Sequence, residues 1–176
     1  METNHPAAAT SAAPPVRPRN IPYARIWTHQ AAPLALSDIE IALTDRGFVP
    51  GFSDPDNTTG PLSEAGLAEA RLEIGAPGYR VISLSSSRGG GCRIYVTPAD
   101  PQTPPDDYLA KRAVPKPRLV YHLEAAGPSN SDRNLTEGLA ETLMILTNGA
   151  VEIGGLGTKG NRPVVHTSRW LGAVRG

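Results

Sequence analysis

The sequence predicts an α+β fold in which a mainly antiparallel sheet carries two main helices on one face. Two segments show the apolar spacing of amphipathic helices, one at residues 38–46 and a longer one within residues 131–147. The segments with strand-like alternation are Tyr23–His29, Arg80–Ser87, Gly91–Thr97, Arg118–Ala125, Ala150–Ile153 and Val164–Thr167. Runs of strands interrupted by few helices favour helices packed on one side of an antiparallel sheet. A ferredoxin-like topology with additions is the hypothesis for the strand order.

The length of the chain, 176 residues, predicts one domain with a tail. Residues 1–20 are rich in Ala and Pro and have no apolar periodicity, which predicts a disordered tail. Residues 21–176 are then a single α+β domain, which is long enough to bury a hydrophobic core.

The N-terminal part of this domain contains a strand and a helix. In Tyr23–His29, alternate side chains point to opposite faces of the sheet. Ser37 and Glu40 have the spacing of a capping box, in which each side chain bonds a backbone N–H group of the other residue. Ser37 is therefore the predicted cap of a helix from residue 38 to residue 46, and Gly47 is its predicted end.

Residues 49–61 are predicted to be a loop. Its acidic and amide side chains suggest a calcium site, but the glycine and glutamate that a calcium-binding EF-hand loop requires are missing at the corresponding positions. An Asx-rich turn is the simpler interpretation. Ser63 then caps a short helix that is predicted to reach Ile74 and to end at Gly75.

The next two strands are predicted to form a hairpin. Arg88-Gly89-Gly90 joins them, and consecutive glycines favour the tight turns of hairpins. Residues 100–116 form a Pro-rich crossing with at most one helical turn around Tyr108. The strand Arg118–Ala125 follows this crossing.

The long helix is the predicted centre of the fold. Its apolar positions recur at spacings of four, four and three, and they are Leu135, Leu139, Leu143 and Leu146. This spacing places them on one side of the helix, and Met144 and Ile145 widen the apolar stripe. Ser131, Asp132 and Asn134 are alternative caps. Asn148-Gly149 is the predicted end, because both residues tolerate the left-handed conformation.

Composition excludes several classes of protein. The formal net charge is zero, which makes nucleic acid an unlikely partner, because nucleic-acid binding depends on a basic surface. The single cysteine, Cys92, excludes an internal disulfide bond. No apolar run is long enough to span a bilayer, so no membrane partner is expected. The N-terminus lacks the pattern of a signal peptide, so the expected location is cytoplasmic.

The glycine-rich loop 154–162 contains a G-x-G-x-x-G match at residues 155–160. A dinucleotide site requires a helix at this point, whereas a β-branched run follows here. The loop is therefore interpreted as a hairpin loop. Its alternative role is anion binding through Lys159 and Arg162, with a contribution from Arg88.

No catalytic residue, metal ligand or cofactor is predicted. Cys92 together with His122 or His166 would be a candidate nucleophile and base. However, Cys92 shares its face with Ile94 and Val96, so it is predicted to be a core residue, and His122 falls on the opposite face of the sheet. The histidines also lack the spacing of zinc ligands.

The sheet face opposite the long helix is the candidate binding surface. It combines aromatic and charged side chains, with Ser83 and Ser85 between them. The predicted partner-binding residues are Arg25, Trp27, His29, Arg93, Tyr95, His122 and Glu124. No other segment is apolar enough to cover this face fully. The alternative is that the short second helix or the Pro-rich crossing packs on it.

The leading functional hypothesis is a non-enzymatic domain that binds a partner protein through this polar-aromatic face. A bacterial inhibitor or immunity-type protein would have this size and lack catalytic residues, although no motif indicates that role. The alternative, from another class, is a small-ligand or nucleotide-binding protein or enzyme that uses the glycine-rich loop 154–162. A third hypothesis is single-stranded nucleic acid stacked on the aromatic side chains.

Overall fold

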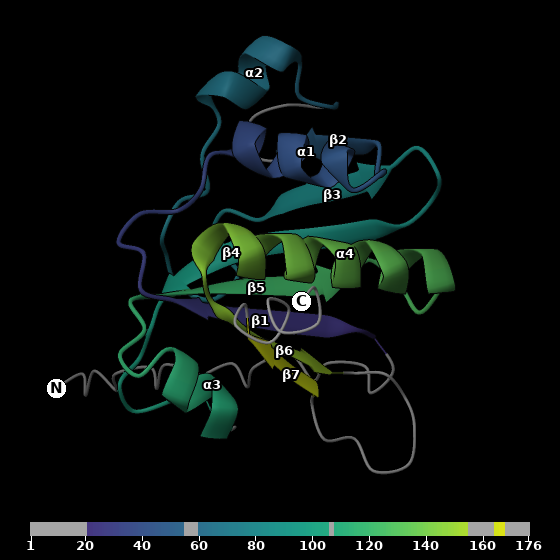
Figure 1. The fold of residues 1–176 in the computed structure, drawn as a ribbon. Coiled ribbons are helices and arrows are strands. Elements are labelled where there is room, and N and C mark those ends of the chain that lie inside the picture. Colours follow the sequence, from purple (N-terminus) through teal and green to yellow (C-terminus); the bar gives the residue numbers. More distant parts are fainter. Residues whose placement is uncertain (1–20, 55–59, 106–107, 155–163, 168–176) are drawn as a thin grey trace, which may run out of the picture.

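The computed structural model describes residues 21–54, 60–105, 108–154 and the backbone of 164–167 (Figure 1). Its elements are β1 (Tyr23–Thr28), α1 (Leu36–Asp45), β2 (Pro50–Ser53), α2 (Glu64–Glu69), β3 (Ile82–Ser86), β4 (Gly91–Pro98), α3 (Tyr108–Ala113), β5 (Leu119–Ala125), α4 (Asn130–Thr147), β6 (Ala150–Gly154) and β7 (Val164–Thr167). The predicted tail 1–20 lies outside the described residues.

One seven-stranded sheet forms the centre of the described structure, in the order β2-β3-β4-β5-β1-β6-β7. Every neighbouring pair in it is antiparallel. The predicted α+β fold with a mainly antiparallel sheet is therefore confirmed. β1, α1, β4, β5, α4 and β6 follow one another as in a β-α-β-β-α-β unit, but β2, β3 and β7 extend the sheet. The ferredoxin-like topology remains a hypothesis.

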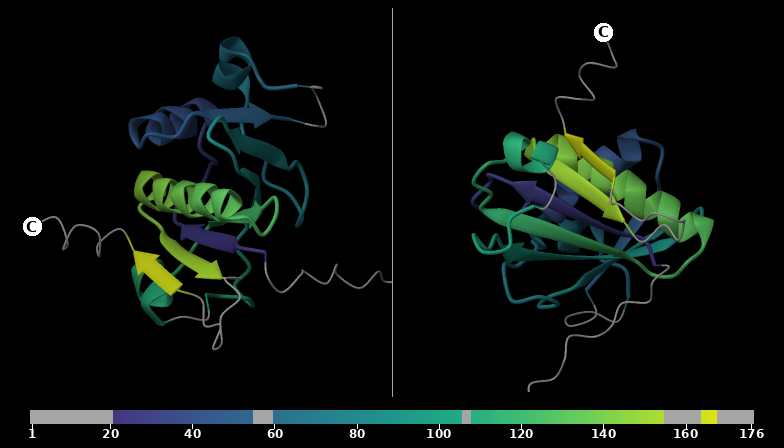
Figure 2. Two further views of the ribbon diagram at one scale, coloured as in Figure 1. Left: turned by 90° about the vertical axis from the view of Figure 1, so that its right-hand side faces the viewer. Right: turned by 90° about the horizontal axis from the view of Figure 1, so that it is seen from below.

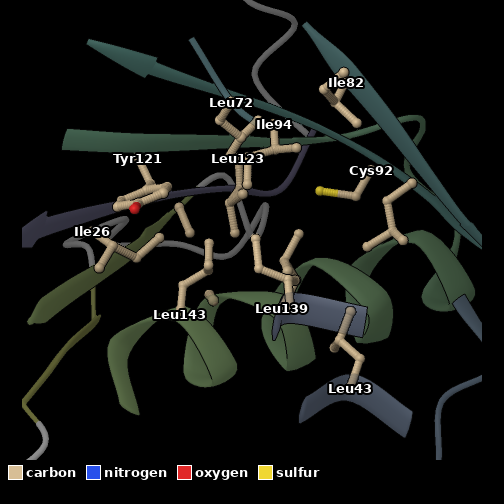
Figure 3. Close-up of a cluster of buried hydrophobic side chains, with 14 of the residues drawn as sticks. Ile26, Leu43, Leu72, Ile82, Cys92, Ile94, Tyr121, Leu123, Leu139 and Leu143 are labelled. Carbon is tan, nitrogen blue, oxygen red and sulfur yellow. The ribbon is translucent and has the colours of Figure 1, made fainter. Parts of the chain in front are cut away.

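The two main helices, α1 and α4, lie on the same face of the sheet, as predicted (Figure 2). α4 crosses β4, β5, β1 and β6, and α1 packs beside it. Figure 3 shows Leu139 and Leu143 of α4 pointing toward Ile26 and Leu123 of the sheet. All four side chains are fully buried or nearly so, and they belong to one continuous core. The inner face of the sheet is thus the main hydrophobic core.

A second, smaller core lies on the opposite face. There α3 contacts β6 and β7, at the far end of the sheet from α2 (Figure 1). The buried members of this core are Trp27, Ala110, Val114, Val120 and Ala150. The Pro-rich crossing therefore packs against the outer face, which was the alternative to a fully exposed face.

The start of α1 differs from the prediction. Ala35, not Ser37, occupies the cap position, and no side chain caps this end. The reason is tertiary: Ala35 forms a β-bridge with Arg71, and the Leu36 N–H donates to the carbonyl oxygen of Ala70 at 3.4 Å. A distant backbone segment thus takes the role that the capping box would have played.

Three other local expectations also change. Residues 50–53, predicted as part of a loop, form the edge strand β2, because pairing with β3 supplies hydrogen bonds that four residues cannot provide alone. The helix capped by Ser63 stops at Glu69 instead of Ile74, since Ala70 is already extended. Ile145 is 49% exposed and does not widen the buried stripe of α4.

The ends of α4 and the hairpin agree better with the sequence. Asn148 adopts the predicted left-handed conformation after the last turn of α4, whereas Ser129 caps its start, ahead of the three predicted candidates. Gly89 and Gly90 connect β3 to β4 with φ values of 94° and 97°, as the hairpin prediction requires.

Candidate functional site

Four polar or aromatic side chains are aligned across the outer face of the central strands. His122 of β5 lies between Tyr95 of β4 and Arg25 of β1 in the strand register. Glu152 of β6 is the register partner of Arg25 on its other side. Antiparallel register partners have neighbouring side chains on one face. The sequence prediction that Arg25, Tyr95 and His122 share a face is therefore consistent with the pairing.

The expected exposure of the two aromatic residues is wrong. Trp27 is only 4% exposed and Tyr95 only 6%. Trp27 is covered because Ala110 of α3 and Val114, the residue after α3, pack with it in the second core. The ring of Tyr95 stacks on His122 with centroids 4.6 Å apart. The outer face is therefore not an open aromatic surface.

The other predicted partner-binding residues separate into two groups. Arg25 and His122 are half-buried and line a pocket together with Trp27. Arg93 and His29 are exposed and Glu124 is half-buried, and all three lie outside the lining of this pocket. Arg93 and Glu124 are register partners on β4 and β5.

The pocket has a volume of about 670 Å³ and is open on one side. Three adjacent strands, β4, β5 and β1, provide its floor, and two connecting segments provide its walls. The floor residues are Arg25, Trp27, Thr97, Val120 and His122. The wall residues are Gly75 and Pro77 in the segment before β3, and Pro98 at the end of β4 with Ala99, Asp100, Pro101 and Thr103 after it.

The sheet holds both walls in place through backbone hydrogen bonds. The Gly75 N–H donates to the carbonyl oxygen of Val96 at 3.1 Å, next to a parallel bridge between Ile74 and Val96. The Ala99 N–H donates to the carbonyl oxygen of Arg118 at 2.9 Å. The prolines in the walls restrict the backbone further. Contacts within the protein therefore fix the backbone of both walls.

Arg25 is the most unusual side chain of the floor. Its Nε atom is buried and has no hydrogen-bond partner among the described residues. The guanidinium group lies 5.6 Å from the centre of the Tyr23 ring, and no ion pair joins it to a carboxylate in the described part of the chain. Buried polar atoms normally have a hydrogen-bond partner, so the buried Nε atom of Arg25 without one is unusual.

His122 and Thr97 provide further polar groups beside Arg25. The Thr97 hydroxyl and the His122 Nε2 atom are 2.9 Å apart and share a hydrogen bond. Asp100 belongs to one wall, and its Oδ1 atom accepts a hydrogen bond from the Gln102 N–H at 2.8 Å. The cationic group thus lies on the floor, and the carboxylate lies in a wall.

Cys92 is placed where the sequence predicted it. It is buried in the main core on the inner face, while His122 lies on the outer face, so the sheet separates them. Burial raises the pKa of the Cys92 thiol to about 12, which keeps it protonated and unreactive at neutral pH. The described residues contain no cluster of side chains suited to a metal ion.

The alternative anion-binding residues, Lys159 and Arg162, lie outside the described residues. Arg88, named with them, lines a smaller pocket of about 260 Å³ between the β3–β4 hairpin and the start of α4. Arg46 also lines this smaller pocket, but it forms an ion pair with Glu141.

Sequence reasoning missed three residues around the outer-face pocket. Thr97 and Glu152 occupy alternate positions of β4 and β6 that face the same side of the sheet as the predicted residues. The alternation of side chains along a strand could therefore have identified both. Asp100 has no such signal, because its position depends on how the segment after β4 folds back over the sheet.

Comparison with known proteins found no matching family model, no matching curated protein and no matching solved structure. Among the helices of the described chain, none is both long and apolar enough to cross a membrane. The functional argument therefore depends on the geometry of the outer face.

Proposed function

We propose that the protein binds a small organic molecule in the pocket on the outer face of the sheet. The observation that carries this proposal is a concave, preformed site of about 670 Å³ with apolar and polar side chains on one floor. Pockets for small ligands typically have volumes of about 300–1,000 Å³ and a few convergent polar groups in a mainly apolar lining.

The lining is suited to a ligand with two kinds of surface. Trp27, Val120 and the wall prolines offer apolar contacts, and Arg25, His122 and Thr97 offer hydrogen bonds and charge. Because Thr97 and His122 bond each other and Tyr95 stacks on His122, the polar side of the site is preorganised. Preorganised groups lose little entropy when a ligand binds.

A pocket-filling variant tests the proposal. Ala99→Trp would place an indole in the wall of the pocket, whereas Ser85→Trp, on an exposed position of β3, is the matched control. A library of small metabolites would be screened by thermal shift, because a ligand that binds only the folded state raises the melting temperature. Compounds that stabilise wild type and Ser85→Trp but not Ala99→Trp are expected. Stabilisation of Ala99→Trp by all the same compounds would contradict the proposal.

A partner protein remains the second candidate, and the exposure of Arg93 and Ser85 on the uncovered part of the outer face favours it. Here the role would be that of an inhibitor or immunity-type protein in the cytoplasm. Its test is capture of a partner by wild type and by Ala99→Trp, but not by Arg93→Glu. Equal capture by Arg93→Glu would exclude this surface. Trp27 and Tyr95 are unsuitable for this experiment because both are buried.

A further inference from the structure

We infer that the ligand of the outer-face pocket is an organic carboxylate whose anionic group pairs with the guanidinium of Arg25. This inference rests on the proposed ligand-binding function and specifies the chemistry of the same site. It combines three observations: the unsatisfied state of Arg25, the arrangement of the neighbouring charges, and the apolar surface beside them.

The first observation is that Arg25 lines the pocket and that its hydrogen-bonding capacity is not fully used by the protein. Its Nε atom is buried and lacks a partner among the described residues, and its guanidinium has only the Tyr23 ring as a charge-related contact there. The planar guanidinium presents parallel N–H groups that match the two oxygens of a carboxylate. The buried Nε atom is not accessible from the pocket, so a carboxylate there would pair with the terminal N–H groups of the half-buried Arg25 side chain.

The second observation concerns the charges around Arg25. Glu152 is its register partner on β6 but does not line the pocket and forms no ion pair with it. Asp100 stands in the wall of the pocket and Glu124 lies further along β5, outside the lining. A dianion such as phosphate would be repelled by the Asp100 carboxylate in the wall more strongly than a monoanion would be. A single carboxylate is therefore the better match.

The third observation is the apolar surface next to Arg25. Trp27 and Val120 form the floor toward α3, and Pro77, Pro98 and Pro101 form the walls. A carboxylate attached to an aromatic or aliphatic body could bury that body here while its charge reaches Arg25. Burial of the body would favour binding, because apolar surface is removed from water.

The test is an NMR titration of the full chain with three probes. Benzoate has the inferred chemistry, benzamide is its neutral analogue, and inorganic phosphate is an anion without an apolar body. Each probe is added to wild type, Arg25→Gln and Arg93→Gln. Arg93 is the matched control, because it is an exposed arginine on the same sheet face outside the pocket. Circular dichroism verifies that each variant is folded.

Benzoate is expected to shift the backbone amides of Arg25, Thr97 and His122 in wild type and in Arg93→Gln. Arg25→Gln should weaken benzoate binding by about tenfold or more, because a charge-assisted hydrogen bond is lost. Benzamide and phosphate should bind wild type at least about tenfold more weakly than benzoate.

Two different results would overturn the inference. If benzamide binds the pocket as tightly as benzoate, or if Arg25→Gln binds benzoate like wild type, the carboxylate inference is wrong and the small-ligand function still stands. If no probe shifts the pocket amides at concentrations of about 10 mM, a range in which even weak ligands bind, the carboxylate inference is also wrong. The proposed function fails separately, if the metabolite screen finds no compound that distinguishes wild type from Ala99→Trp.

Discussion

Trp27 shows how strongly the surroundings of one residue determine its role. Alternation along β1 places the Trp27 side chain on the outer face of the sheet. The packing of α3 on that face then buries the side chain in the second core. Trp27→Ala should therefore lower the free energy of unfolding by about 3–5 kcal/mol, as for other buried tryptophans. Chemical denaturation measures this change, and Trp27→Phe should cost clearly less. A loss near zero for the alanine variant would show that α3 does not cover this position.

Asp132 is the residue with the clearest pH-dependent contribution. Its carboxylate accepts hydrogen bonds from the Ser129 hydroxyl at 2.6 Å and from the Gly91 N–H at 2.8 Å. The Ser129 hydroxyl, followed by backbone donors, holds the pKa of Asp132 below its ordinary value of 3.8. A lowered pKa means that the folded state favours the charged form.

The stabilisation from Asp132 is therefore complete above pH 3.8 and is lost as the pH falls through the lower folded-state pKa. Asp132→Asn should cost about 0.5–1.5 kcal/mol at neutral pH, because the group is partly exposed to water. Urea unfolding at several pH values should show this difference shrinking below pH 3.8. A difference that stays constant down to the lowest pH would show that the charge of Asp132 has no role.

At the scale of the element, α4 is the helix on which the main core depends. Leu139 and Leu143 are fully buried against the sheet, whereas Ile145 is exposed on the same helix. Leu139→Ala or Leu143→Ala should cost about 2–5 kcal/mol in chemical denaturation. Ile145→Ala is the matched control and should cost less than about 0.5 kcal/mol. Equal costs at buried and exposed positions would contradict the placement of α4.

The β3–β4 hairpin depends on Gly90 for two reasons. Its φ of 97° is left-handed, and a Cβ at this position would collide with the carbonyl oxygen of Ser131 at the start of α4. Gly90→Ala should therefore destabilise the protein by about 1–3 kcal/mol. Gly60→Ala is the control, since its Cβ would meet no atom within 4 Å. Thermal unfolding of both variants separates the local strain from a general effect of replacing glycine.

At the scale of the whole molecule, one sheet separates two cores of unequal size. The main core fills the space under α1 and α4, and the second core depends on α3. Ala110→Asp should release α3, because a carboxylate cannot be buried there without a large cost in solvation. Leu109→Asp, at a 55% exposed position of α3, is the control.

The fluorescence of Trp27 reports the release of α3. The chain has two tryptophans, so the experiment uses a Trp170→Phe background. Ala110→Asp should shift the emission of Trp27 to longer wavelength, and Leu109→Asp should not. An unchanged spectrum in Ala110→Asp would show that the second core does not depend on α3.

The sequence by itself determined the fold class, the inner face of the sheet and the burial of Cys92. These follow from alternation in the strands and from the spacing of Leu135, Leu139 and Leu143, which are periodic patterns that neighbouring residues carry locally. The end of α4 at Asn148 and the hairpin at Gly89-Gly90 were predictable for the same reason, because left-handed backbone conformations favour particular residue types.

Only the tertiary structure determined which side chains of the outer face are covered and which line a pocket. The start of α1, the strand β2 and the cover over Trp27 each depend on a backbone segment far away in the sequence. The pocket likewise requires β1, β4 and β5 to meet two connecting segments, and Asp100 has no periodic signal that places it there. Local patterns report which side of a strand a residue occupies, but which segment covers that side depends on packing across the whole chain.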